Sequence, residues 1–381
     1  MMSIYADNAA TTKMSRSALD AMTACMAEIY GNPSSLHSTG QRAYQALTEA
    51  REKIASFLCC QPNEIIFTSG GSESDNQAIR SAAAAGSRSG KKHILSTAFE
   101  HHAVLHTLDR LKSEGFEITL LDVPPNGIID PDKAASAIRS DTCLVTVMAA
   151  NNEIGTLQPV AEIGAVCRSK GVLFHTDAVQ AAGHMEINVS DWCADMLSLS
   201  AHKFHGPKGV GLLYCRRDVP LASLICGGAQ EKGRRAGTEN VPGITGMAAA
   251  MEDSLRDLPR KQQQISALRD RLMQGLAEIP GSFLNGDAKK RLPGNVNYSF
   301  EGIDGEALLM ILDEKGIAAS SGSACTAGSM DPSHVLLALG RSYDLAKGSL
   351  RLSIDEENTG EEIETIVREV TAGVGLLRKL G

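Results

Sequence analysis

The feature that most constrains the fold is a repeated alternation of short apolar runs with longer helical stretches over about residues 64–200. The apolar runs cover residues 65–68, 93–97, 117–122, 142–148, 172–174 and 196–200. Helical periodicity follows most of them, for example over 131–138 and 160–170. Repeated strand–helix units are typical of a mainly parallel sheet that is covered by helices. We therefore predict an α/β fold with a large domain built on such a sheet.

The length of the chain allows a second domain. With 381 residues, of which 43% are hydrophobic and 22% charged, the composition is that of a globular protein with room for two cores. A long helix with a polar face, at about 256–279, marks the passage between them. We predict a large domain over 14–256 and a smaller α+β domain formed by 1–13 and 257–381.

Charge and cysteine content exclude several classes of protein. A formal net charge of −8 disfavours nucleic acid as a main partner, because phosphate binding needs a basic face. The N-terminal stretch carries Asp7 where a signal peptide would be apolar, and no apolar run reaches membrane-spanning length. Nine cysteines without paired CxxC spacing favour reduced thiols over disulfides or zinc. We expect a cytoplasmic protein that is not bound to a membrane.

Two residues at strand ends suggest the chemistry. Lys203 lies between two apolar runs, where desolvation favours the neutral amine that can attack a carbonyl; the alternative is a solvated loop lysine such as Lys208. Asp177 follows the run 172–174, at the sheet edge where open α/β folds bind ligands. Proteins that bind pyridoxal phosphate (PLP) use a lysine that binds it covalently and an aspartate that pairs with its pyridine nitrogen. A helix cap is the alternative for Asp177.

The same edge of the sheet should collect further polar groups. Gly70, Gly71 and Ser72 open a helix, and the free N–H groups there favour a single phosphate, although glycine before a helix is also common without a ligand. Asn152 and His101 follow other strands, and the flat imidazole of His101 suits stacking on a cofactor ring. His101, His102 and His106 could bind a metal ion, but no HExxH motif and no nearby cysteine or aspartate completes a zinc set. We therefore predict no metal site.

Two residues near the C-terminal end stand out. Cys325 lies in a small, polar, glycine-flanked loop, at about 321–332, which we predict to be mobile; its thiol is either an oxidation liability or a nucleophile that travels. The other eight cysteines stand in helices, strands or apolar contexts. Arg351 is surrounded by apolar strand residues, so it needs a partner, either a substrate carboxylate or an internal carboxylate.

Together these residues carry a family resemblance. The chain resembles cysteine desulfurases of the nitrogen-fixation and iron–sulfur-assembly type, within the class V aminotransferase-like, fold type I PLP enzymes. The matching stretches are YADNAATT, YGNPSSLHSTG, FTSGGSESDN, EHHAV, NNEIGTLQP, HTDAVQ, SLSAHKFHGPKGVG, RRAGTENV, SSGSACTAGS and LRLS. They span nearly the whole chain. The SSGSAC stretch is similar to the long-loop subgroup, whereas the chain ends sooner after its last helix than some members do.

The resemblance implies a role for each matched residue. Lys203 would bind PLP covalently, Asp177 would pair with its pyridine nitrogen, and His101 would stack on the ring and act in catalysis. Cys325 would take the sulfur of L-cysteine as a persulfide, leaving L-alanine. Gln180 and Asn152 would contact the ring oxygen. The phosphate would be held by Gly71, Ser72, Ser200 and His202, together with Thr238 from the other subunit of a homodimer. The substrate carboxylate would be bound by Arg351, Asn152 and Asn32.

The resemblance also leaves alternatives. A selenocysteine lyase, a cysteine-sulfinate desulfinase or an aminotransferase would use the same cofactor. A non-catalytic scaffold would hold iron–sulfur intermediates through Cys325, which is in any case a candidate transient ligand. The expected partner is a sulfur-acceptor or iron–sulfur scaffold protein, serving nitrogenase, tRNA thiolation or general cluster assembly.

Overall fold

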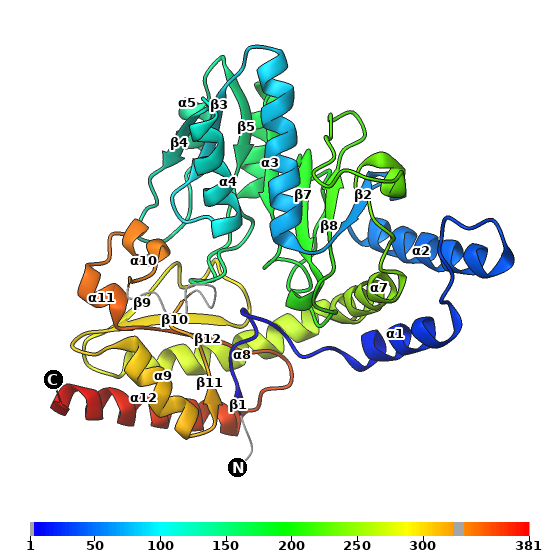
Figure 1. The fold of residues 1–381 in the computed structure, drawn as a ribbon. Helices are drawn as coiled ribbons and strands as arrows, with labels where there is room; N and C mark the ends of the chain where they lie inside the picture. The colour runs from blue at the N-terminus through cyan, green and yellow to red at the C-terminus, as the bar shows by residue number, and fades with distance from the viewer. Residues whose placement is uncertain (1–3, 323–330, 381) are drawn as a thin grey trace.

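A computed structural model describes residues 4–322 and 331–380. Cys325 and most of the predicted cysteine loop lie outside the described residues. The part of the chain before residue 256 is built on a seven-stranded sheet (Figure 1). Its strand order is β2-β8-β7-β6-β5-β3-β4. The strands are β2 (Ile65–Thr68), β3 (His93–Thr97), β4 (Glu117–Leu121), β5 (Thr142–Thr146), β6 (Leu173–Asp177), β7 (Met196–Ser200) and β8 (Gly211–Cys215).

The prediction of a mainly parallel sheet is confirmed. Every neighbouring pair from β7 to β4 is parallel, and only β8 runs antiparallel to its neighbours β2 and β7. The antiparallel pair follows from the short connection between β7 and β8, because a parallel pair would need a long crossover. Two strand ends differ from the prediction. β5 ends at Thr146 instead of residue 148. β6 continues beyond Phe174 to Asp177, because His175 and Thr176 are fully buried and remain in the ladder.

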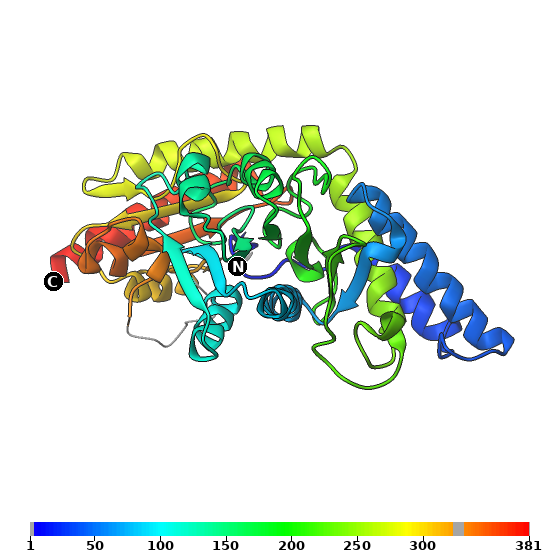
Figure 2. The same cartoon turned by 90° about the horizontal axis from the view of Figure 1, so that it is seen from above.

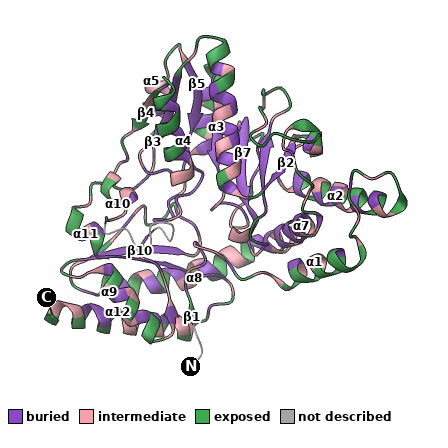
Figure 3. Ribbon diagram, in the orientation of Figure 1, coloured by how far each residue is buried: buried purple, intermediate pink, exposed green. Residues whose placement is uncertain are grey.

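Both faces of this sheet are buried except along the edge strand β4, which explains the nearly continuous apolar runs of the other strands. Ile65 and Phe67 belong to one hydrophobic core and Ile66 to another, since successive side chains of a strand point to opposite faces. Figure 3 shows the inner strands as buried and the outer helix faces as exposed. The covering helices are α2 (Ser38–Phe57), α3 (Gly71–Arg88), α4 (His102–Ser113), α5 (Pro131–Ala137), α6 (Val160–Ser169) and α7 (Val241–Leu255).

Helix α1 (Arg16–Glu28) packs on α7 at the side of the molecule, next to α2 (Figure 1). Ser15 caps α1 by accepting a hydrogen bond from the Ala18 N–H, as a serine at this position predicts. Large apolar side chains remain exposed on α1, on α2 and on the loop between them. They are Leu19, Met26, Tyr30, Leu36 and Tyr44.

A second core is formed around a three-stranded antiparallel sheet of order β12-β10-β9. Its strands are β9 (Ser282–Leu284), which the sequence did not predict, β10 (Asn295–Phe300) and β12 (Ser349–Ser353). The N-terminal β1 (Ile4–Tyr5) joins this unit by pairing with β11 (Ile317–Ala318). The helices of this part are α8 (Leu258–Ala277), α9 (Gly305–Glu314), α10 (His334–Ala338), α11 (Tyr343–Lys347) and α12 (Gly360–Leu380). Val335, Leu336, Leu339 and Ala346, in and next to α10 and α11, belong to the core of the first part, so the domain boundaries remain predictions.

Helix α8 runs along one side of the molecule and links the two parts, while α3 is seen nearly end-on (Figure 2). Within the described ranges, no helix is both long and apolar enough to span a membrane. The expectation that all cysteines other than Cys325 stand in helices, strands or apolar contexts is wrong for two of them. Cys59 and Cys226 are exposed: Cys59 has a positive φ of 54° just after α2, and Cys226 lies in the coil between β8 and α7.

Candidate functional site

A cavity of about 550 Å³ opens at the carboxyl ends of β6 and β7, where open α/β sheets bind their ligands. Segments that are far apart in the sequence meet there. The cavity is lined by ten of the thirteen residues to which the sequence assigned a role: Gly71, Ser72, His101, Asn152, Asp177, Gln180, Ser200, His202, Lys203 and Arg351. The convergence of strand ends at one edge is therefore confirmed.

Lys203 stands at the end of a short 3-10 turn, Ala201–Lys203, that directly follows β7. Its Nζ donates to the carbonyl oxygens of Ala9 (2.6 Å) and Ala10 (2.8 Å) in the N-terminal segment. Its side chain is half-buried, whereas Lys208, the comparison for a solvated lysine, is exposed. The amine is thus fixed at the cavity wall.

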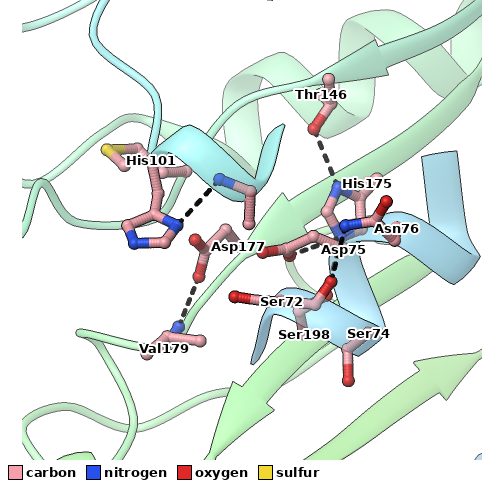
Figure 4. A network of polar contacts seen from close by, with 12 residues as sticks. Ser72, Ser74, Asp75, Asn76, His101, Thr146, His175, Asp177, Val179 and Ser198 are labelled. Atoms are coloured by element: carbon pink, nitrogen blue, oxygen red, sulfur yellow. Dashed lines mark hydrogen bonds and ion pairs between the residues drawn. The ribbon is translucent and has the colours of Figure 1, made fainter. Parts of the chain in front are cut away.

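Asp177 ends β6 and lines the cavity, and its side chain lies between those of His101 and Asp75 (Figure 4). Its Oδ1 accepts a hydrogen bond from the Val179 N–H at 2.9 Å, so the carboxylate fixes a turn and still lines the cavity. Burial raises the pKa of this carboxyl group, and the Val179 N–H and the Lys203 charge oppose that rise. A cation placed beside Asp177 would therefore be strongly favoured, because it restores the ionised form.

His101 caps α4 and lines the same cavity. Its Nδ1 accepts from the Ala103 N–H at 3.1 Å. Burial, followed by the charge of Lys203, lowers the pKa of His101 to about 4, and the same two causes lower the pKa of His202 to about 4. Both imidazoles are consequently neutral near pH 7, which suits stacking on a flat ring better than a charged imidazolium does.

The N-terminus of α3 provides an anion cradle. Gly70 caps this helix and has no side chain that could accept from the first-turn N–H groups, so they face the cavity beside Ser72 and Ser200. Space here is tight: a Cβ on Gly71 would lie 2.7 Å from Val179 Cγ2, and one on Gly211 would lie 2.6 Å from Gly70 Cα. An amine, a carboxylate, a flat imidazole and an anion cradle around one cavity are the groups that PLP requires.

Sequence reasoning missed a buried polar network beside the cavity, which one of its members, Asp75, also lines (Figure 4). Asp75 of α3 offers a carboxylate oxygen within 4.8 Å of ligand atoms of His101 and Asp177. Asp75 also lies 3.6 Å from His175, whose ring contacts Thr146 at 2.8 Å and Ser198 at 3.0 Å. Burial and repulsion from Asp177 raise the pKa of Asp75. Asp75 belongs to the stretch ESDN at the start of α3, which is visible in the sequence. Only the fold brings Asp75 close to Asp177.

Glu100, a second buried acid of this region, predicts a pH dependence of stability. Its carboxyl group accepts from Thr97 Oγ1 (2.7 Å) and from the Met148 N–H (3.0 Å), and burial raises its pKa to about 8. The folded state therefore keeps a proton that the unfolded chain has lost, so stability falls as pH rises towards 8. Relative to Glu100→Gln, the wild-type apoprotein should lose about 2 kcal/mol of unfolding free energy between about pH 6 and pH 8.

Urea unfolding of both proteins at the two pH values measures this difference. Glutamine keeps the size of the side chain and an acceptor for the Met148 N–H, which makes it the matched variant. If the unfolding free energies of the two proteins changed equally between the two pH values, Glu100 would already be ionised in the folded state.

Arg351 reaches the cavity from β12, in the second sheet. It is 1% exposed; its Nη2 donates to Asp7 Oδ1 at 2.9 Å and its Nη1 to the Asn152 carbonyl at 3.1 Å. Its Nε has no hydrogen-bond partner within the described residues. Both interpretations from the sequence hold in part, because the guanidinium has an internal ion pair and also lines the cavity.

Three predicted residues are not found at the cavity of the described chain. Asn32 is exposed in the loop after α1, where its Oδ1 accepts from the Ser34 N–H at 2.9 Å. Thr238 is exposed and lines a separate cavity of about 60 Å³, which shares Ser69 and Gly209 with the main one. Cys325 lies outside the described residues.

The comparisons with known proteins agree with this geometry. The family model for aminotransferase class-V matches residues 4–366. A curated cysteine desulfurase IscS of Methanosarcina thermophila is 48% identical over 377 residues, which cover 99% of this chain and 93% of that protein. A solved structure named a NifS-like protein superimposes with a TM-score of 0.92 at 37% identity, over 98% of this chain and all of that one. A structure of SspA in complex with cysteine has a TM-score of 0.83 at 36% identity, over 92% and 99%.

The chain belongs to the class V aminotransferase family, whose PLP-binding fold and cavity it shares. Within that family it is one of the NifS/IscS-type cysteine desulfurases, and its cofactor is pyridoxal 5'-phosphate.

Proposed function

We propose that this protein transfers the sulfur of L-cysteine to Cys325 and releases L-alanine. The Cβ–S bond of the substrate breaks and a bond forms between the Cys325 Sγ and that sulfur. The proton lost by the Cys325 thiol is balanced by the one gained at Cβ. The observation that carries the proposal is the joint position of Lys203, Asp177 and Arg351 around one cavity. Ser320, shortly before Cys325 in the chain, donates to the same Asp7 carboxylate that pairs with Arg351.

We infer a role for each cavity residue from its surroundings. Bound PLP would supply an electron sink for bond cleavage at the substrate carbons. Lys203 is the amine that would bind the cofactor and move protons, and Asp177 would hold the pyridine nitrogen. His101 would cover the ring. Around the rest of the cofactor, the ring oxygen would be contacted by Gln180 and Asn152 and the phosphate by Gly71, Ser72, Ser200 and His202.

We infer further that the active unit is a homodimer. Thr238 and Asn32 are exposed and do not line the cavity of their own chain, so they could serve the phosphate and the substrate of a neighbouring subunit. The exposed apolar side chains of α1, α2 and their loop support an interface on that side of the molecule. The eight cysteines of the described ranges are free thiols, which is compatible with a cytoplasmic location. The acceptor would be a sulfur-carrier or iron–sulfur scaffold protein.

The decisive experiment supplies cysteine with labelled sulfur to the PLP-loaded enzyme. Alanine and protein-bound persulfide should form in equal amounts in the first turnover, with the label on the peptide that contains Cys325. Parallel reactions with selenocysteine and cysteine sulfinate compare the alternative substrates. Alanine release without label on the protein would exclude the proposed transfer.

Replacing Arg351 by alanine should mainly raise the KM for cysteine. A charge-assisted clamp on the substrate carboxylate contributes roughly 1.5–3 kcal/mol, which corresponds to a rise of about ten- to a hundredfold, whereas kcat should change less. Asp7→Asn is the matched control, because it breaks the same 2.9 Å ion pair but keeps the guanidinium. An equal rise of KM in both variants would show that Arg351 acts through the fold instead of binding substrate.

A further inference from the structure

Three histidines that the proposed reaction does not use form a cluster beside the cavity. His102 and His106 stand one turn apart on α4, and their ring centroids are 4.9 Å apart with planes inclined by 17°. His334, the first residue of α10, places its ring 4.5 Å from that of His102. The sequence showed only the pair on α4; the third imidazole, more than 220 residues away, is brought to it by the fold.

The hydrogen bond of His334 fixes the orientation of its ring. Its Nε2 lies 2.9 Å from the carbonyl oxygen of Glu100. Because a carbonyl can only accept, Nε2 carries the proton and Nδ1 carries the lone pair. A backbone carbonyl that holds one nitrogen of an imidazole is the usual support for a histidine that ligates a metal through the other nitrogen.

A buried carboxyl group borders this cluster and would favour a bound cation. The buried side chain of Glu153 accepts a hydrogen bond from Ser333 and interacts electrostatically with His102, so a carboxyl group borders the cluster.

We propose that His102, His106 and His334 bind one divalent ion of the zinc class beside the cavity. Imidazole is a preferred ligand of Zn²⁺, Co²⁺ and Ni²⁺, and histidines at i and i+4 of a helix lie on one face and can share an ion. The rings stack in this structure and the three ligand nitrogens do not all lie within 4.8 Å of one another, so binding requires the exposed side chain of His106 to turn about its own bonds. Three protein nitrogens leave a fourth position for water or an external ligand.

Titration of the PLP-loaded protein with Co²⁺ tests the proposal. The wild type should bind one ion per chain in equilibrium dialysis and show the visible bands of four-coordinate cobalt with nitrogen ligands, which Zn²⁺ displaces. His106→Gln and His334→Gln should each weaken binding by at least about tenfold, because even loss of a group that only supports a ligand has an effect of this size. His37→Asn is the control, since His37 is exposed and asparagine also caps a helix.

The result that overturns the site is equally specific. The site is excluded if the wild type shows no saturable binding of Co²⁺. It is also excluded if His106→Gln and His334→Gln both bind Co²⁺ as tightly as the wild type does. Cobalt bound by thiols would instead show thiolate-to-metal charge-transfer bands that persist in both variants. None of the three histidines lines the cavity, so failure of this test leaves the desulfurase proposal untouched.

Discussion

Lys203→Ala should abolish the formation of alanine from cysteine, lowering turnover by at least about a thousandfold. The substitution removes the amine that would bind the cofactor covalently and the group that would move protons between substrate atoms, and both effects are large. The fold should survive, because the side chain is only half-buried, although its removal also removes two hydrogen bonds to the carbonyl oxygens of Ala9 and Ala10 and the charge that faces Asp177.

The control for this variant is Lys208→Ala, five residues further along the same loop. Lys208 is exposed and lines the same cavity, so its removal makes the same change of charge there without removing the sequestered amine. Borohydride reduction should fix the cofactor to the wild type and to Lys208→Ala, but not to Lys203→Ala. Alanine release at the wild-type rate by Lys203→Ala would refute the assignment of the cofactor lysine.

Cys325→Ser should separate the chemistry at the cofactor from sulfur transfer. The serine hydroxyl is far less ionised than a thiol and attacks sulfur poorly, so alanine production should fall by about a hundredfold or more and no persulfide should accumulate. Every residue that lines the cavity remains in place, so the variant should still bind PLP. Added cysteine should therefore still change the absorbance of the bound cofactor.

The structure supplies two controls for this experiment, Cys59→Ser and Cys226→Ser. Both thiols are exposed and neither lies at the cavity, so they test whether any accessible cysteine can take the sulfur. Each should keep near wild-type alanine release. If Cys325→Ser retained normal rates while one of these variants lost activity, the nucleophile would be that other cysteine.

Much of the site was predictable because its residues are defined locally. A strand end places its next residues at the sheet edge, and a glycine-opened helix presents free N–H groups, whatever the rest of the chain does. For this reason Asp177, Lys203, His101 and Ser72 could be placed at one cavity from short stretches of sequence. The interpretation of Lys203 as sequestered and of Lys208 as solvated depended on their immediate neighbours alone.

The remainder depended on contacts between distant segments. The ion pair of Arg351 with Asp7 joins residues that are 344 positions apart, and no local pattern reveals it. Equally, the position of Asp75 close to Asp177 follows from the packing of α3 on the sheet, and the approach of His334 to His102 from the packing of α10 near α4. The sequence by itself determined the α/β class, the strand ends and the residues offered to the ligand, because hydrophobic periodicity and turn chemistry act over a few residues. Only the tertiary structure decided which charges face one another and which pKa values shift, because burial and proximity arise when remote segments pack together.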